Sequence, residues 1–252
     1  RNVPQAHSAL KAGRWERSKW NGVELSDKTL GIVGLGRIGK LVAQRALSFG
    51  MKLVAYDPFV SAEAARRLSV RLVGLDDLVA EADFLTLHLA KTPETIGLIG
   101  ADLLAKAKPS LRIINVARGG IIDEAALADA IRAKQVAGAA IDVFATEPCT
   151  DSPLFELDEV VVTPHLGAST VEAQDKAGDT IADMLALALA GDFVPFAVNV
   201  SAGVVDETVR PFQGLAEQLG AVLAGLVASD DRSAIEISYD GQLAEHDTQI
   251  LT

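Results

Sequence analysis

Three ionisable residues that lie far apart in the sequence each follow a short apolar stretch typical of a buried strand. Arg118 follows Ile-Ile-Asn-Val-Ala, Glu147 follows Ile-Asp-Val-Phe-Ala-Thr, and His165 follows Val-Val-Thr-Pro. A guanidinium holds a carboxylate through two hydrogen bonds, and a histidine can give a proton to a carbonyl oxygen near neutral pH. A carboxylate beside that histidine favours the imidazolium form and fixes the ring. These residue types are suited to reducing a 2-oxo acid, or to the reverse oxidation of a 2-hydroxy acid with neutral His165 as the base.

This chemistry requires the three side chains to converge, so the strands that precede them must be neighbours and parallel. The carboxyl ends of parallel strands share one edge of a sheet, which is where ligands bind in open α/β folds. The alternative is that Arg118 and Glu147 are surface ions and His165 is a loop residue with satisfied hydrogen bonds. The position of all three at strand ends favours the catalytic interpretation.

A glycine-rich turn predicts the site of a dinucleotide. Gly34, Gly36 and Gly39 form G-x-G-x-x-G between a strand at residues 30–33 and a helix with one mostly apolar stripe. The first glycine permits a tight turn, the second lets the backbone approach a pyrophosphate, and the third lets the helix lie close to the strand. The helix N-terminus then faces the phosphates. Arg37, inside the turn, is either a phosphate contact or a solvated charge.

Asp57 indicates which dinucleotide is bound. It ends a second strand at residues 52–56 and lies 18 residues after Gly39. A carboxylate there accepts hydrogen bonds from the adenosine ribose and repels a 2′-phosphate, which predicts NAD rather than NADP. Asp142, at another strand end, has two open roles: it contacts the nicotinamide side of the cofactor, or it orders a turn.

The rest of the chain alternates strands and helices. We expect strands at residues 70–73, 84–89, 112–116, 136–143 and 160–163, and helices at 4–12, 61–68, 75–82, 101–107 and from Asp123. A capping box from Ser169 to Glu172 opens a long helix to about residue 190. Such alternation predicts an α/β fold with a doubly wound parallel sheet. His88 falls within a strand and is a core or strand-end residue rather than a ligand.

Composition restricts the partners. The 252 residues carry a net charge of −11, which disfavours a nucleic acid or an anionic membrane. No apolar run approaches the ~20 residues that span a bilayer. The single cysteine, Cys149, fits a reducing compartment, so we expect a cytoplasmic location. We expect no metal site. The chain begins without Met, and we expect that both ends are cut.

Four motifs together resemble the D-isomer-specific 2-hydroxyacid dehydrogenase family over roughly residues 1–200. They are Val33-Gly-Leu-Gly-Arg-Ile-Gly39, Asn115-Val-Ala-Arg-Gly-Gly120, Asp142-Val-Phe-Ala-Thr-Glu-Pro148 and Thr163-Pro-His-Leu-Gly-Ala-Ser169. The resemblance implies that Arg118, Glu147 and His165 are the catalytic residues. It also implies NAD contacts by Arg37, Ile38, Asp57, Thr92, Val116, Ala117, Arg118, Asp142, His165, Gly167 and Ala168.

Within this family the chain is most similar to the long bacterial members. The resemblance implies NAD-dependent oxidation of 3-phospho-D-glycerate, the first step of L-serine biosynthesis, by a homo-oligomer. It implies an NAD-binding domain at residues 1–168 with a truncated first helix. Residues 169–200 would form a helix and strand that return to a largely missing substrate domain. Residues 201–252 would begin an intervening domain, with a helix at 212–227 and a strand at 234–239.

Two alternatives stay open. The three catalytic residues do not recognise the far end of a substrate, so the substrate could be hydroxypyruvate, glyoxylate or another 2-oxo acid. The chain could also be an NAD-sensing protein-binding module, similar to the transcriptional corepressors that resemble this family. The acidic charge and the sequence after Asn199 favour the biosynthetic enzyme. Phosphate dependence of turnover distinguishes these possibilities.

Overall fold

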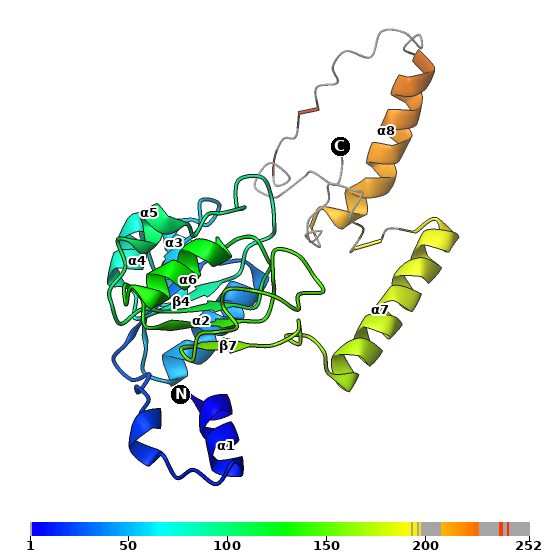
Figure 1. Cartoon of the computed structure of the whole chain (residues 1–252). Coiled ribbons are helices and arrows are strands. Elements are labelled where there is room, and N and C mark those ends of the chain that lie inside the picture. The colour runs from blue at the N-terminus through cyan, green and yellow to red at the C-terminus, as the bar shows by residue number, and fades with distance from the viewer. Residues whose placement is uncertain are drawn as a thin grey trace. The chain divides into compact units, whose positions relative to one another are not determined.

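The computed structural model describes residues 2–192, 194–195, 197, 208–226, 237–238 and 241. The chain divides into two compact units, Arg1–Ser169 and Thr170–Thr252. The first unit contains a parallel sheet with helices on both of its faces (Figure 1). In the described part of the second unit lie α7 (Val171–Ala190), the 3-10 helix η2 (Arg210–Phe212) and α8 (Gln213–Leu226).

The sheet has seven strands in the order β3-β2-β1-β4-β5-β6-β7, and every neighbouring pair is parallel. Because the chain builds outward from β1 to β3 and then returns to place β4 beside β1, the winding direction reverses between β1 and β4. Ligands of doubly wound sheets bind at such a point. The strands are β1 Thr29–Val33, β2 Lys52–Tyr56, β3 Arg71–Leu72, β4 Phe84–Leu87, β5 Arg112–Asn115, β6 Gly138–Ile141 and β7 Val160–Val162.

Strand register aligns the carboxyl ends of six strands. A single row of paired residues crosses the sheet through Tyr56, Val33, Leu87, Asn115, Ile141 and Val162. Each of these residues is the last of its strand. The loops that follow these strands therefore start from one edge of the sheet, as the predicted site requires.

The described part of the first unit has seven helical segments: α1 Val3–Lys11, η1 Arg17–Trp20, α2 Arg37–Ser48, α3 Ala62–Arg67, α4 Leu75–Glu81, α5 Ala101–Leu104 and α6 Glu124–Arg132. Of these, α2–α6 cover the two faces of the sheet. Residues of α2 and α3 pack with Ile32 and Leu53 in one apolar cluster. Residues of α4, α5 and α6 pack with Val33 and Val54 in the other. Neighbouring residues of a strand thus enter opposite clusters, because their side chains alternate between the faces.

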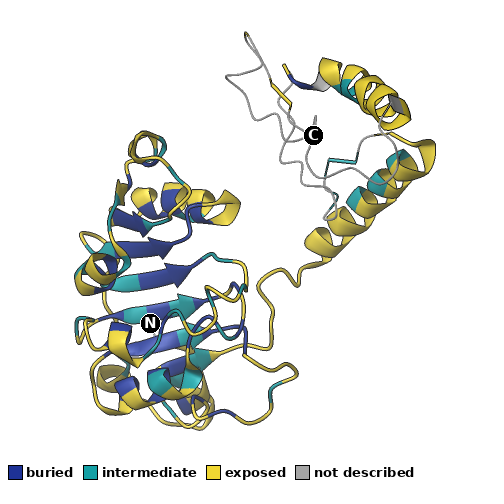
Figure 2. Ribbon diagram, turned by 90° about the horizontal axis from the view of Figure 1, so that it is seen from above, coloured by how far each residue is buried: buried dark blue, intermediate teal, exposed yellow. Residues whose placement is uncertain are grey.

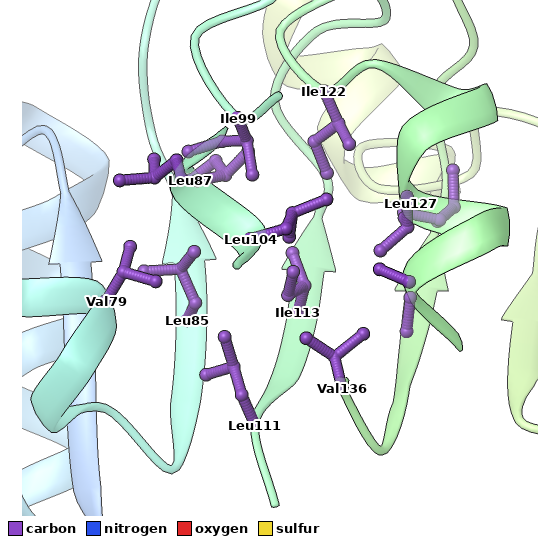
Figure 3. Packing of buried hydrophobic residues seen from close by; sticks show 14 of the residues in the cluster. Val79, Leu85, Leu87, Ile99, Leu104, Leu111, Ile113, Ile122, Leu127 and Val136 are labelled. Atoms are coloured by element: carbon purple, nitrogen blue, oxygen red, sulfur yellow. The ribbon is translucent and has the colours of Figure 1, made fainter. Parts of the chain in front are cut away.

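The cluster beneath α4–α6 is the larger core (Figure 3). Leu85 and Ile113 from the sheet, Leu104 from α5 and Leu127 from α6 are each at most 1% exposed. Figure 2 shows the central strands as mostly buried between more exposed helices. Burial on both faces explains why these strands read as apolar runs in the sequence.

The predicted α/β fold with a doubly wound parallel sheet is confirmed. The predicted N-caps are also confirmed: the side chains of Ser61 and Asp123 accept hydrogen bonds from the N–H groups of Ala64 and Ala126. The capping box at Ser169 is wrong by one residue.

Thr170 is the N-cap of α7, and its Oγ1 accepts a hydrogen bond from the N–H of Ala173 at 3.1 Å. Ser169 is held in the preceding loop, where its N–H donates to the carbonyl of Leu166. The helix predicted at residues 101–107 is shorter, ending at Leu104. The strand predicted at 234–239 lies largely outside the described residues, as does most of the segment that would hold the return strand. No helix in the described ranges is long and apolar enough to cross a membrane.

Candidate active site

The glycine turn links β1 to α2 and has the three properties expected of a phosphate-binding turn. Gly34 adopts φ +92°, and a Cβ there would approach the carbonyl oxygen of His88 to 2.6 Å. A Cβ on Gly39 would lie 2.1 Å from the carbonyl oxygen of Gly34, so only glycine allows the helix to lie this close. By contrast, a Cβ on Gly36 would meet nothing within 4 Å. The backbone at Gly36 is thus open on the side from which a ligand can approach.

The first turn of α2 also leaves room for an anion. Gly36 is its N-cap, and no side chain caps the helix. Arg37 and Ile38, the first two helical residues, are exposed. Helix N-termini carry unsatisfied N–H groups and a partial positive charge, which suit a phosphate. These features fit the pyrophosphate of a dinucleotide.

Asp57 is anchored to the same turn from the end of β2. Its Oδ2 accepts a hydrogen bond from the N–H of Leu35 at 2.7 Å, and its Oδ1 accepts one from the N–H of Phe59 at 2.9 Å. The carboxylate is therefore fixed beside the glycine turn, where the sequence predicted a ribose contact. Carboxylate oxygens have further acceptor capacity beyond these two bonds.

Arg118 lies in a turn that Asn115 shapes. Asn115 ends β5 and is 2% exposed. Its side chain accepts from the N–H of Ala117 and donates to the carbonyl of Arg118, each at 3.0 Å. Arg118 itself is exposed, and its Nη1 donates to the carbonyl of Ala117. No other hydrogen bond from this guanidinium appears in the described structure, so it retains donors for a carboxylate.

Glu147 and His165 form a direct pair. Glu147 Oε2 lies 2.7 Å from His165 Nδ1, and Glu147 Oε1 accepts a hydrogen bond from the N–H of Phe144 at 2.8 Å. The bond with His165 and then that with Phe144 hold the pKa of Glu147 below its ordinary value. With the carboxylate on Nδ1, the imidazole has Nε2 available to exchange a proton with a substrate.

Asp142 holds the loop that carries His165. It is 4% exposed; Oδ1 accepts from the N–H of Leu166 at 2.7 Å and from the hydroxyl of Thr163, and Oδ2 accepts from the N–H of Gly167 at 2.8 Å. Burial alone would raise the pKa of Asp142, but these hydrogen bonds outweigh it and lower the pKa. The structure thus shows the turn-ordering role, and a cofactor contact by Asp142 stays a prediction.

The loop after β7 has a strained backbone at the predicted catalytic residue His165. His165 adopts φ +56°, and its N–H donates to the carbonyl of Asp142 at 2.8 Å. A Cβ on Gly167 would lie 2.5 Å from Val116 Cγ1, so this loop packs against the Arg118 turn. The loops that carry the predicted catalytic residues Arg118 and His165 are therefore in contact, although His165 lies 47 positions after Arg118 in the sequence.

A chain of contacts therefore joins the three predicted catalytic residues at one edge of the sheet. Gly119, next to Arg118, lies against the carbonyl of Phe144, and the N–H of Phe144 binds Glu147. Glu147 in turn binds His165. Thr92 lies in the loop after β4, where its N–H donates to Thr95 Oγ1. Among the described residues, no hydrogen bond links Thr92 or Ala168 to the other predicted site residues, so their roles stay predictions.

His88 is half-buried in the loop after β4. Its Nε2 lies 3.1 Å from Thr86 Oγ1, and its N–H donates to the carbonyl of Val33. Burial lowers the pKa of His88. These contacts describe a histidine that stabilises the loop rather than a free ligand.

Sequence reasoning missed residues that hold the site together. Asn115 and Thr163 act through the contacts given above, and Glu124 accepts a hydrogen bond from the N–H of Ala145 at 2.6 Å. A polar residue inside an apolar strand was a usable signal for Asn115. No periodicity in the sequence signals Glu124, because its partner lies 21 residues away.

Comparison with known proteins agrees with this geometry. A family model described as the NAD binding domain of D-isomer specific 2-hydroxyacid dehydrogenases matches residues 1–167. The D-3-phosphoglycerate dehydrogenase of Mycobacterium tuberculosis (strain ATCC 25618 / H37Rv) is 55% identical over 251 residues, covering 100% of this chain and 47% of that protein. The protein of that name from Synechocystis is 49% identical over 248 residues, covering 98% and 45%. The chain thus spans about half the length of these relatives.

Solved structures share the fold. A glyoxylate reductase from Paecilomyes thermophila matches with a TM-score of 0.71 at 33% identity, over 77% of this chain and 59% of that chain. The D-lactate dehydrogenase from Aquifex aeolicus, complexed with NAD and lactic acid, matches with a TM-score of 0.68 at 28% identity, over 76% and 62%.

Proposed function

This chain belongs to the D-isomer specific 2-hydroxyacid dehydrogenase family, and from that premise we propose that the whole protein catalyses the reversible, NAD-dependent oxidation of 3-phospho-D-glycerate to 3-phosphohydroxypyruvate. This reaction is the first step of L-serine biosynthesis. The observation that carries the proposal is the 2.7 Å contact between Glu147 Oε2 and His165 Nδ1. Gly119, next to Arg118, packs on Phe144 and so places Arg118 beside this pair. The names of relatives up to 55% identical support the choice of substrate.

The residues of the glycine turn and Asp57 fit NAD. The open backbone at Gly36 and the uncapped start of α2 suit the pyrophosphate, and the fixed Asp57 carboxylate suits the ribose. When bound, NAD supplies the acceptor or donor of a hydride. We infer further contacts from Arg37, Ile38, Thr92, Val116, Ala117, Arg118, Asp142, His165, Gly167 and Ala168.

Arg118, His165 and Glu147 have separate roles toward the substrate. Arg118 holds the carboxylate, since its guanidinium is exposed and retains unpaired donors. During oxidation His165 Nε2 takes the proton of the 2-hydroxyl group, and in the reverse reaction it returns a proton to the carbonyl oxygen. Glu147 holds Nδ1 and stabilises the imidazolium while the proton resides there.

The far end of the substrate is what distinguishes the alternatives. Arg118, Glu147 and His165 act on the carboxylate and the adjoining carbon, so a second candidate is reduction of hydroxypyruvate or glyoxylate. The likeness to a glyoxylate reductase at 33% identity supports this candidate.

We propose that the protein works as a homo-oligomer in the cytoplasm. Residues 1–168 would form the NAD-binding domain, residues 169–200 would return to a substrate domain, and residues 201–252 would begin an intervening domain.

The test is NADH oxidation by the full-length protein with 3-phosphohydroxypyruvate, hydroxypyruvate, glyoxylate and pyruvate, with His165→Ala as the matched inactive control. We expect strong preference for the phosphorylated acid. Equal or better rates on an unphosphorylated acid would retain the reaction type and replace the substrate. Tight NADH binding without turnover on any of the four would refute the enzymatic proposal in favour of an NAD-sensing module.

A further inference from the structure

Two consecutive backbone N–H groups in the loop after β6 are each held by a carboxylate. The N–H of Phe144 donates to Glu147 Oε1 at 2.8 Å, and the N–H of Ala145 donates to Glu124 Oε1 at 2.6 Å. The first bond closes the turn on itself. The second ties the turn to a different element, because Glu124 is the first residue of α6.

Helix α6 is a firm support for this tie. Asp123 caps it by accepting from the N–H of Ala126 at 3.0 Å. On its inner face, Leu127 and Ala128 are 0% exposed and Ile131 is 4% exposed. Glu124 therefore projects its carboxylate from a helix that is fixed in the larger core.

The same connection, from β5 to α6, carries Arg118. It meets the turn at 144–147 in two places. At Gly119 the two backbones touch so closely that a Cβ would lie 1.7 Å from the carbonyl oxygen of Phe144. Five residues further along, Glu124 binds the N–H of Ala145. Contacts at both points fix the segment that carries Glu147 relative to the segment that carries Arg118.

We propose that Glu124 is a positioning residue for the reaction: its carboxylate, by binding the N–H of Ala145, holds the turn that presents Glu147 to His165 in register with Arg118. Glu124 acts through this turn. The proposal rests on the proposed function, because it concerns the same three catalytic residues.

Three substitutions of Glu124 in the full-length protein distinguish its hydrogen bond with the N–H of Ala145 from a second effect of an acidic residue here, which is stabilisation of α6. A negative charge in the first turn of α6 also stabilises the helix dipole. Glu124→Asp keeps that charge but is shorter by one C–C bond of about 1.5 Å, too short to keep the contact. Glu124→Gln loses the charge but keeps the length and an accepting oxygen. Glu124→Ala removes both. The matched control is Asp129→Ala, on the same helix, whose carboxylate pairs with Arg132 and with no other side chain in the described part of the chain.

The first readout is steady-state kinetics with the preferred acid of the panel. We expect kcat to fall at least about tenfold in the Asp and Ala variants, which corresponds to ~1.4 kcal/mol. Glu124→Gln should retain most of kcat, and Asp129→Ala should match the wild type. NADH affinity should stay within a few fold throughout. Full kcat in Glu124→Asp would overturn the proposal, as would a loss in Glu124→Gln equal to that in Glu124→Ala.

The second readout is the acid limb of the kcat profile, which a purely stabilising role would not move. His165 and the N–H of Phe144 hold the pKa of Glu147 low, whereas burial and, to a smaller extent, the charge of Asp142 raise it. A loosened turn weakens the Phe144 bond, so the pKa of Glu147 rises and activity is lost at a higher pH as the solution is acidified. We expect this shift in the Asp and Ala variants only. Lower thermal stability with an unmoved acid limb would assign Glu124 a structural role.

A third readout needs no substrate. Hydrogen exchange of the Ala145 amide in the full-length protein should accelerate at least about tenfold in Glu124→Asp and Glu124→Ala, and little in Glu124→Gln. An unchanged exchange rate in Glu124→Asp and Glu124→Ala would refute the role of the hydrogen bond between Glu124 and Ala145, even if the protein were active. If the wild type turned over none of the four acids while exchange behaved as expected, the proposed enzymatic function would fail. The hydrogen bond by which Glu124 holds the turn at 144–147 would still be supported.

Discussion

Two glycines of the same turn should respond differently to alanine, one by losing stability and the other by losing NADH affinity. The structure places a Cβ on Gly39 at 2.1 Å from the carbonyl oxygen of Gly34, and both groups are backbone. Neither can rotate away, so α2 must move from β1 or the turn must open. Overpacking of this kind costs about 1–3 kcal/mol. At about 2–4 °C per kcal/mol for a domain of this size, Gly39→Ala should lower Tm by about 2–12 °C.

Gly36→Ala should leave the fold intact and weaken the dinucleotide. The backbone at Gly36 has φ −73° and ψ −156°, ordinary extended values, and a Cβ there meets nothing within 4 Å. Because Gly36 is the N-cap of α2 and makes no side-chain bond, its replacement should cost less than about 1 kcal/mol. The added methyl group occupies the side from which a pyrophosphate approaches, so NADH affinity should fall at least about tenfold.

Thermal unfolding followed by circular dichroism, together with NADH titration by fluorescence, measures both effects on the full-length protein. The reasoning requires a crossed result, in which Gly39→Ala loses stability and Gly36→Ala loses affinity. If Gly36→Ala bound NADH like the wild type, the open side of the turn would not be where the cofactor lies. If Gly39→Ala unfolded at the wild-type Tm, the close contact of helix and turn would be wrong.

The remaining predictions concern the ionisable residues. His165→Ala should reduce kcat by about 10²–10⁴-fold with NADH affinity within a few fold; loss of NADH binding in a titration would instead make it a cofactor contact. Asp57→Asn keeps an oxygen for the N–H of Leu35 but removes the charge, so the ratio of kcat/KM for NADH to that for NADPH should fall, and an unchanged ratio would show that another group recognises the ribose. Arg118→Lys should lower kcat/KM because lysine cannot make the two-pronged carboxylate contact; a near-normal value would remove Arg118 from substrate binding. Since hydrogen bonds lower the pKa of Glu147, its ionised form persists below the ordinary range of a glutamate, and a pH series should show activity falling only as the pH drops through that lowered pKa.

The fold was predictable because most of its strands are short apolar runs that helices separate. Residues 30–33 and 53–55 are buried, so these central strands carry no polar face that would obscure the pattern. In-register parallel pairing then places the following loops at one edge. The convergence of Arg118, Glu147 and His165 was therefore predictable from strand ends alone, without knowledge of any side-chain contact, and their catalytic roles stay predictions.

Contacts between a side chain and a distant backbone were not predictable. Asp142 binds the N–H groups of Leu166 and Gly167, more than twenty residues away, and Glu124 binds that of Ala145. Such pairs follow no helical or strand period, and only the packing of loops selects them. The shift of the N-cap from Ser169 to Thr170 has a similar cause, since both residues can cap a helix and the loop decides which is available.

Four carboxylates at the carboxyl edge of the sheet influence how this acidic chain can bind an anionic substrate. Asp57, Asp142, Glu147 and Glu124 each accept at least one backbone N–H group, and Glu147 also faces His165. Their negative charge is thus partly offset by local dipoles. The exposed guanidinium of Arg118 donates, within the described structure, a single hydrogen bond, to the carbonyl of Ala117. With a net charge of −11, the field of the whole chain repels an anionic substrate, and added salt screens that repulsion. Attraction must therefore come from short-range contacts such as the one at Arg118, which salt weakens less when the pair is shielded from solvent.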